Sequence, residues 1–485
     1  MKDATGPLAF WNRYQKILGN DFDAFYAAQH ASLPKTLRVN TLRNTVPEFL
    51  EWAKKYHPDW KLTSHPFSSE IFLIDRDQRH HPLGKNLGHI QGRFYIQEAS
   101  SALPPLALKV VPGQRVLDIA SAPGSKSTQI AGLLQAQGSL FSNEFSGSRI
   151  KVLAANLQRC GVPNAIVSHL SGERFGNLLP EYFDRILVDA PCTGEGTFRK
   201  DRNALLNWSL QRILAAGKLQ KSLLRSAFQA LKPYGILVYS TCTLAPEENE
   251  GVLRSLLAEF GDAVEICDLS GLFLEAHRAQ GLSEFVSEQF SFAPKVLRVW
   301  PHLFNSEGFF VAAIRKTESL RNSKHLPPLR KERAGSLQIL PEKHSQEIQK
   351  AFSSAFQFSL PPHILIAERK GFLWGIPQGA EDAMPLLSPD RPGILLGKMH
   401  RNKLRISHEC AVAFGVHFSG NLVLECSAEE ARAFLRGENL VSPPHLPEKA
   451  DILLRFQGLP LGLTRKVEGS LKNNLPRNFL MEDVH

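Results

Sequence analysis

Strand-like and helix-like hydrophobic patterns alternate from residue 115 to residue 260, and this alternation constrains the fold more than any other feature. Short apolar runs typical of buried strands are separated by segments whose apolar residues recur at helical spacing. We expect strands at 115–120, 139–143, 164–170, 183–189 and 236–240, and helices at 125–137, 150–157, 215–231 and 246–260. This order predicts an α/β fold with a parallel, doubly wound sheet and right-handed crossovers.

The length and charge of the chain set the organisation around this core. The 485 residues carry 57 Lys and Arg against 47 Asp and Glu, a formal net charge of +10. This length is enough for two to four domains. We expect a small mixed segment over 1–95, the α/β core over 96–317, a basic linker over 318–346 and a β-rich region over 347–485. This charge is explained either by a soluble basic protein without a special partner or by one that binds a polyanion such as nucleic acid.

Several classes of protein are excluded by the sequence. The longest apolar runs fall far short of the roughly 20 residues that cross a bilayer, and residues 1–16 contain no apolar block of a secretory signal. We therefore expect a cytoplasmic protein. The six cysteines form no CxxC pair and no cluster at zinc spacing, so we predict free thiols and no metal. Nothing demands more than a monomer.

The loop after the first core strand reads Ala-Ser-Ala-Pro-Gly-Ser-Lys over residues 120–126. Gly124 at the start of a helix allows a ligand to approach backbone N–H groups, although a tight turn would also explain it. Ser125 separates Gly124 from Lys126, so a phosphate loop of the Walker type is excluded. Glu144 follows the second strand about 20 residues later, where a ribose diol would need an acceptor. These features predict a site for a nucleoside-like ligand.

Two cysteines follow the fourth and fifth strands. Cys192 lies in the string DAPCTGEG and Cys242 in STCT. Because neighbouring parallel strands end at the same edge of a sheet, we expect the two thiols to lie side by side above the ligand crevice. Two buried structural thiols are the alternative.

Paired thiols beside a nucleoside-like site suit one demanding reaction. A thiolate that adds to C6 of a pyrimidine makes C5 nucleophilic enough to attack an electrophilic methyl group. Asp189 is placed to hydrogen-bond N3 and the exocyclic amine of a cytosine, or it is a carboxylate that caps a turn. The acceptor of the C5 proton stays open among Cys192, Asp189 and water.

At these positions the chain resembles a known family. The strings VLDIASAPGSKSTQIA, FDRILVDAPCTGEG, LVYSTCTLAPEENE, GRFYIQEASSALPP and EGFFVAAIRKT are similar to those of the RNA cytosine-5 methyltransferases of the nucleolar-protein/Sun group. The bacterial members that act on small-subunit ribosomal RNA resemble the chain most. The resemblance implies a Rossmann-like core that uses S-adenosylmethionine, an RNA-binding N-terminal segment and a PUA-like RNA-binding C-terminal region.

The same resemblance assigns roles to individual residues. It makes Cys242 the nucleophile and Cys192 the residue that helps to release the product, a choice that the sequence pattern alone does not make. It implies that Asp189 lies at both the cofactor and the target base. The residues that it places at the cofactor are Ala120, Ser121, Ala122, Pro123, Gly124, Ser125, Lys126, Glu144 and Asp189.

One position departs from the family pattern. Where the family has an acid after the third strand to bind the adenine amine, this chain has Ser171. Ser171 weakens cofactor binding, or Glu173 substitutes for the missing acid. A non-catalytic RNA-binding assembly factor is therefore the alternative to a methyltransferase.

The surface that binds RNA is predicted from basic clusters, each of which is otherwise a solvated face. We expect phosphates near the run at 199–202, with Phe198 stacking on a base. The other candidates are Lys35, Arg38, Arg455, Arg465, Lys466, Lys472 and Arg477.

Overall fold

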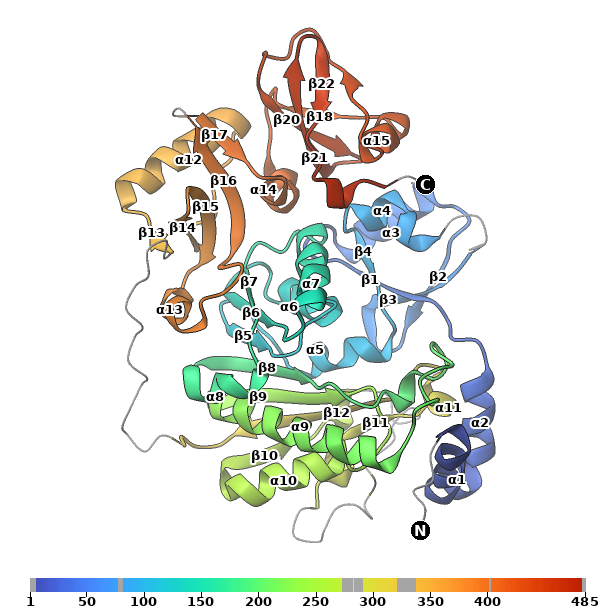
Figure 1. Ribbon diagram of the computed structural model, residues 1–485. Helices are drawn as coiled ribbons and strands as arrows, with labels where there is room; N and C mark the ends of the chain where they lie inside the picture. Colours follow the sequence, from blue (N-terminus) through green and yellow to red (C-terminus); the bar gives the residue numbers. More distant parts are fainter. Residues whose placement is uncertain are drawn as a thin grey trace.

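A computed structural model describes residues 6–76, 82–272, 282, 291–320, 337–400 and 403–481. Figure 1 shows the central α/β unit, with the N-terminal elements along one side and two β-rich units at the C-terminal end of the chain. Most of the linker predicted over 318–346, including Arg321, Lys324, Arg330, Lys331 and Arg333, lies outside the described residues.

The central sheet has the strand order β10-β12-β9-β8-β5-β6-β7, with β11 paired to β12. Five strands are parallel, as predicted: β5 (Arg115–Asp118), β6 (Ser139–Asn143), β7 (Ala165–Ser168), β8 (Phe183–Asp189) and β9 (Leu231–Thr241). The prediction of a purely parallel sheet is wrong at one edge. There β12 (Phe309–Lys316) runs antiparallel to β9, β10 (Val264–Cys267) and β11 (Leu297–Val299).

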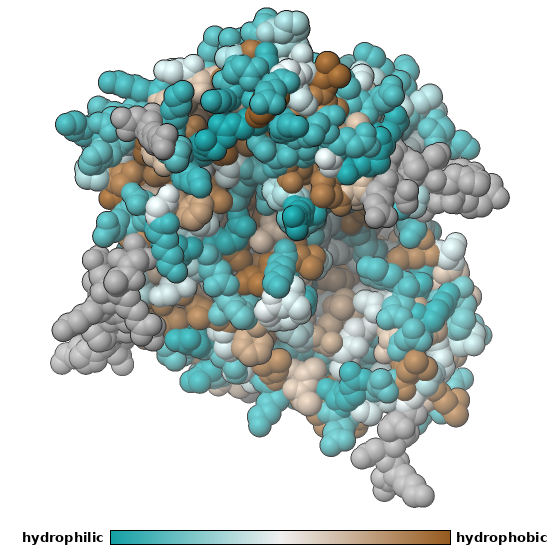
Figure 2. Space-filling view, turned by 45° about the horizontal axis from the view of Figure 1, so that its top comes forward, coloured by the Kyte–Doolittle hydropathy of each residue, from teal (hydrophilic) through white to brown (hydrophobic). Residues whose placement is uncertain are grey.

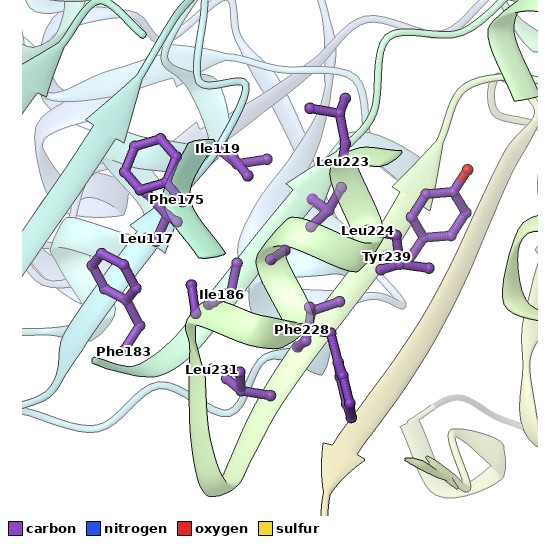
Figure 3. Packing of buried hydrophobic residues seen from close by; sticks show 14 of the residues in the cluster. Leu117, Ile119, Phe175, Phe183, Ile186, Leu223, Leu224, Phe228, Leu231 and Tyr239 are labelled. Carbon is purple, nitrogen blue, oxygen red and sulfur yellow. The ribbon is translucent and has the colours of Figure 1, made fainter. Parts of the chain in front are cut away.

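Helices cover both faces of this sheet because successive strand residues point to opposite sides. Leu117 and Ile119 face the helices α8 (Phe175–Leu178), α9 (Leu210–Ala230) and α10 (Glu250–Phe260). Figure 3 shows this packing, with Leu224 and Phe228 of α9 near Ile186 and Tyr239. Val116 faces the other way, toward α5 (Leu103–Ala107), α6 (Ser125–Leu133) and α7 (Gly147–Arg159). The sheet is therefore doubly wound.

The N-terminal elements form two units. The helices α1 (Gly6–Leu18) and α2 (Phe22–His30) pack with Trp208, Leu244 and Trp300 of the core in an aromatic cluster. A four-stranded antiparallel sheet follows, made of β1 (Thr36–Val39), β2 (Lys61–His65), β3 (Ser68–Asp75) and β4 (Phe94–Ile96). It packs on α3 (Val46–Tyr56), while the short α4 (Leu87–Ile90) precedes β4.

The C-terminal region contains two five-stranded sheets. The first consists of β13 (Gln338–Ile339), β14 (Ile364–Arg369), β15 (Phe372–Pro377), β16 (Ile394–His400) and β17 (Lys403–Ile406). It is accompanied by α12 (Glu342–Phe356), α13 (Met384–Leu387) and α14 (His408–Phe414). Since β13 and α12 begin before residue 346, the predicted end of the linker is wrong. Residues 342–356 are helical because Ile348, Phe352 and Phe356 form one buried stripe.

The second sheet has the order β18-β20-β21-β22-β19. Its elements are β18 (Val423–Glu425), α15 (Ala428–Leu435), β19 (Leu440–Val441), β20 (Asp451–Phe456), β21 (Leu459–Val467) and β22 (Ser470–Asn473). No helix in the described ranges is long and apolar enough to cross a membrane. Figure 2 shows small hydrophobic patches separated by hydrophilic residues on the face in view.

Candidate active site

Side chains of α7 hold the loop between β5 and α6 in place. Gly124 has φ +109°, and a Cβ atom there would lie 3.2 Å from the Cδ1 atom of Leu153. Asn156 donates to the carbonyl of Pro123 at 3.0 Å, and Arg149 donates to that of Ala122 at 2.6 Å. The close approach to α7 and the positive φ explain why glycine occupies position 124.

The ends of β5 and β6 carry buried carboxyl groups with spare acceptor atoms. Oδ1 of Asp118 is buried and accepts no hydrogen bond from the described residues. Oε2 of Glu144 is also buried and accepts no hydrogen bond from them, but it forms an ion pair with Nη1 of Arg149 at 3.3 Å. Burial raises the pKa of Asp118 to about 7. Phe145, beside Glu144, is 73% exposed. Spare acceptors beside an exposed aromatic ring fit the ribose and base of a nucleoside.

Ser171 lies half-buried after β7, where its hydroxyl donates to Glu173 at 3.2 Å. The exposed Glu173 also accepts a hydrogen bond from Ser222 at 2.5 Å. The adenine role predicted for Ser171 and the substitution by Glu173 stay predictions.

The structure brings the two predicted cysteines together. Cys192 follows β8 and Cys242 follows β9, and their Sγ atoms lie 3.3 Å apart. The hydrogen bond to the Cys242 sulfur, together with burial, raises the pKa of the Cys192 thiol well above its usual range. The protonated form of Cys192 is therefore favoured, and either thiol can donate to the other sulfur.

Asp189 lies at the end of β8, between the loop at 120–126 and the cysteines. Its Oδ2 atom accepts from Nζ of Lys126 at 2.7 Å, and its Oδ1 atom accepts from Ser240 at 2.8 Å. Burial opposes the charge of Lys126, but Asp189 raises the pKa of this ammonium group overall. The side chain of Lys126 thus connects the predicted cofactor loop to Asp189.

Two buried glutamates that sequence reasoning missed hold the cysteine loops in place. Glu248 accepts from the backbone N–H of Thr193 at 3.0 Å and from Gln220 at 2.7 Å, and burial raises the pKa of Glu248 to about 7. Glu195 accepts from Trp208 at 2.5 Å and from Tyr14 at 2.6 Å. Acids three and six residues after the cysteines are the signal that could have revealed them.

Several residues predicted to bind RNA have structural roles instead. Arg38 is 2% exposed and donates to Thr128 at 2.9 Å and to the carbonyl of Ser125 at 2.8 Å. Lys466 is buried against the carbonyls of Pro444 and Leu446. A basic side chain that binds carbonyls inside a protein cannot be told from a phosphate ligand by sequence alone.

The basic run at 199–202 contains both buried and exposed side chains. Arg199 is buried and donates to the carbonyls of Ser32 and Ser306. Phe198 is also buried, with its ring 5.6 Å from that of Trp11, so the predicted stacking on a base is wrong. Lys200 and Arg202 are exposed, and Arg202 donates to the carbonyl of Gln29.

Groups of different chemistry meet at one edge of the central sheet. Two sulfurs, a carboxylate and an ammonium group converge where β8 and β9 end, next to a loop that fits a nucleoside. Within the described ranges, no group of three or more His, Cys, Asp or Glu is placed to hold a metal ion.

Three family models match the chain. The model of 16S rRNA methyltransferase RsmB/F matches residues 105–315, and that of the N-terminal domain of 16S rRNA methyltransferase RsmF matches residues 7–99. The model of the methyltransferase RsmF PUA domain matches residues 421–481, which contain the second C-terminal sheet. The PUA match therefore covers only the later part of the region predicted over 347–485.

Curated proteins match over nearly the whole chain. Ribosomal RNA small subunit methyltransferase F of Vibrio parahaemolyticus is 40% identical, covering 98% of this chain and 98% of its own. The protein with the same description from Cronobacter sakazakii is 42% identical, covering 96% of this chain and 94% of its own.

Solved structures match about two thirds of the chain. A methyltransferase homologue from Pyrococcus horikoshii has a TM-score of 0.55 at 34% identity, covering 63% of this chain and 93% of its own. NSun6 from Pyrococcus horikoshii with SFG has the same TM-score of 0.55 at 21% identity, covering 64% of this chain and 99% of its own, and so shows the fold alone. With these matches and this site, the chain belongs to the ribosomal RNA small subunit methyltransferase F family.

Proposed function

We propose that this chain methylates C5 of a cytosine in 16S, small-subunit ribosomal RNA through a covalent bond between Cys242 and C6. One observation carries the proposal: the Sγ atoms of Cys192 and Cys242 lie 3.3 Å apart beside the pair of Asp189 and Lys126. A single thiol would serve attack alone, whereas a second thiol at this distance also serves release. The family membership supports ribosomal RNA as the substrate.

S-adenosylmethionine supplies, when bound, an electrophilic methyl group. The loop at 120–126 and Phe145 would hold it, with Glu144 and Asp118 as acceptors for its ribose hydroxyls. Among the described residues, Oδ1 of Asp118 accepts no hydrogen bond, and Oε2 of Glu144 meets only the exposed Arg149, so both oxygens could accept from a ribose diol. Ser171 would lie at the adenine.

The chain's own residues act on the base. The Cys242 thiolate adds to C6, and C5 thereby becomes a nucleophile. Asp189 accepts from the exocyclic amine of the cytosine and shares a proton with N3, which draws electron density from the ring and so favours the addition. When Cys242 leaves, the S–H group of Cys192 donates to the departing thiolate. The target cytosine must be unstacked to reach both thiols, which implies a flipped or single-stranded nucleotide.

The partners follow from this chemistry. We propose that ribosomal RNA or the small ribosomal subunit binds to a monomer of this chain in the cytoplasm. The exposed Lys200 and Arg202 lie on the loop that follows Cys192 and would contact phosphates.

The test is transfer of labelled methyl from S-adenosylmethionine to small ribosomal subunits, and to their stripped RNA, from cells that lack this protein. We expect the label in 5-methylcytosine. Digestion and mass spectrometry would identify the modified base and its position. Label in another base, or none on either substrate, would contradict the proposal.

The alternative, a non-catalytic assembly factor, rests on Ser171 in place of an acid. It predicts tight binding of the subunit without affinity for S-adenosylmethionine, which calorimetry measures directly. In that case Ser171→Asp would be the first variant to restore cofactor binding.

A further inference from the structure

The loop that enters β12 lies against both cysteine-bearing loops. The backbone N–H of Gly308 donates to the carbonyl of Gly196 at 2.9 Å, and that of Gly196 donates to the carbonyl of Cys242 at 2.9 Å. Arg199 fixes the same loop by donating to the carbonyl of Ser306 at 3.1 Å. Residues 305–309 therefore form part of the wall around the cysteines.

Glu307 lies in this wall next to Glu98, whose Oε1 atom accepts from the backbone N–H of Glu307 at 3.1 Å. Phe309, the first residue of β12, follows two residues later. The ring of Phe309 lies 5.3 Å from Nζ of Lys126, which donates to Asp189. The charge of Lys126 also acts on the Glu307 carboxyl group, in agreement with this placement.

The Glu307 carboxyl group has a spare acceptor in a buried place. Glu307 is 6% exposed, and its Oε1 atom is buried without a hydrogen-bond donor. Burial and the repulsion from Glu98 raise the pKa of Glu307 to about 7, while Lys200, Lys126 and Arg199 oppose the rise. At neutral pH this group both accepts and releases a proton readily.

The other acids around the cysteines are already engaged in hydrogen bonds. Both carboxylate oxygens of Asp189, Glu195, Glu248 and Glu98 accept hydrogen bonds from the protein. The raised pKa keeps Cys192 a thiol, which donates a proton and does not accept one.

Two further carboxyl groups of the core, those of Asp118 and Glu144, have a spare buried oxygen like Glu307. They lie at the ends of β5 and β6, on the side of the loop at 120–126. Glu307 is the one that shares the wall of the cysteines.

We propose that Glu307 is a further catalytic residue, the acceptor of the proton that leaves C5 of the target cytosine. This role rests on the proposed methylation of C5. After C5 has gained its methyl group, the C5–H bond breaks and the proton passes to Oε1 of Glu307. The electron pair of that bond forms the C5–C6 double bond, the bond between C6 and the Cys242 sulfur breaks, and Cys242 leaves as a thiolate. Glu307 then releases the proton to water.

The test uses the full chain with small-subunit RNA that carries tritium at C5 of cytosine. For Glu307→Gln, which keeps the shape but accepts no proton, we expect tritium release to fall at least 100-fold. A covalent protein–RNA adduct that holds the labelled methyl group should accumulate under denaturing electrophoresis. The limb near pH 7 in the wild-type pH profile of tritium release should disappear.

Two variants make the result specific. Glu307→Asp keeps a carboxylate in a shorter side chain, so we expect intermediate tritium release and a retained pH limb. Glu265→Gln, at an exposed ion pair on β10, is the matched control and should behave as the wild type. Thermal unfolding of all three variants verifies that each is folded.

Two outcomes would overturn the inference. One is Glu307→Gln that releases tritium at the wild-type rate with the same pH profile. The other is a folded Glu307→Gln that binds RNA but forms no methylated adduct, because Glu307 would then act before methyl transfer. A wild-type chain that releases no tritium would contradict the proposed function itself, which separates the two failures.

Discussion

At the scale of single residues, protonation distinguishes the roles proposed for the two thiols. The Sγ atoms of Cys192 and Cys242 lie 3.3 Å apart, and the raised pKa of Cys192 keeps its proton in place. A thiol that keeps its proton is a poor nucleophile, because the thiolate is the reactive form. Cys242 is therefore the better candidate for attack, in agreement with the role that the family resemblance implies.

Substituting each cysteine separately tests which thiol attacks C6 and which assists release. For Cys192→Ala we expect a covalent protein–RNA adduct that survives denaturing electrophoresis, because the departing thiolate loses its donor. For Cys242→Ala we expect no adduct and a loss of methyl transfer of at least 1,000-fold. The reverse pattern would show that Cys192 attacks.

A second prediction concerns Phe145, whose exposed ring lies beside Glu144. If the ring covers the adenine, Phe145→Ala should weaken S-adenosylmethionine binding by about 1 kcal/mol, or about five-fold. Calorimetry measures the change. Val152→Ala, at an exposed position of α7, is the control and should leave the affinity unchanged. An unchanged affinity in Phe145→Ala would remove Phe145 from the cofactor site.

At the scale of elements, the site depends on loops that share backbone contacts. A Cβ atom at Gly196 would lie 2.2 Å from the carbonyl oxygen of Gly308 and 2.8 Å from that of Cys242. Both neighbours are backbone atoms, so neither moves aside as a flexible side chain would. The glycine thus allows the loop after β8 to touch both the loop after β9 and the loop before β12.

We therefore expect Gly196→Ala to lower the free energy of unfolding by about 2 kcal/mol, since overpacking forces the backbone to shift. Methyl transfer should fall as well, because the loops that carry the two thiols shift relative to each other. Urea denaturation measures the first effect. Gly84→Ala, where a Cβ atom meets nothing within 4 Å, is the matched control. Equal stability of the two variants would contradict this account.

At the scale of the whole molecule, the first C-terminal sheet is joined to the edge of the central sheet. Val167 of the edge strand β7 pairs with Arg391 through backbone hydrogen bonds of 2.8 and 3.2 Å. Tyr182 donates to Asp382 at 2.6 Å. An open strand edge is a liability that proteins cover. The C-terminal region thus stabilises the catalytic sheet as well as extending it.

Buried acids make the stability of the whole molecule depend on pH. Asp118, Glu248 and Glu307 each have a pKa raised to about 7 in the folded state by burial. Unfolding releases their protons at any pH between about 4.5 and 7, so their contribution to stability is lost as the pH rises through that window. For Glu248 alone the loss is about 3 kcal/mol.

We expect the free energy of unfolding to be lower at pH 8 than at pH 5.5, and Glu248→Gln to show a smaller decline than the wild type. Chemical denaturation at both pH values measures the difference. Glu265→Gln, at an exposed position, should decline as the wild type does. Equal declines in Glu248→Gln and the wild type would show that Glu248 does not bind a proton on folding.

The sequence by itself determined the order of the core strands and helices, because hydrophobic periodicity depends only on local spacing. It also determined the positions of Cys192, Cys242, Asp189 and Glu144 at strand ends, since parallel strands end at one edge. Tertiary structure decided the rest. The antiparallel edge of the sheet, the burial of Arg38 and Phe198, and the roles of Glu195, Glu248 and Glu307 depend on contacts between residues far apart in the chain. Whether a polar side chain meets a solvent molecule, a carbonyl or a reacting base is a property of its surroundings, which its own sequence neighbours do not encode.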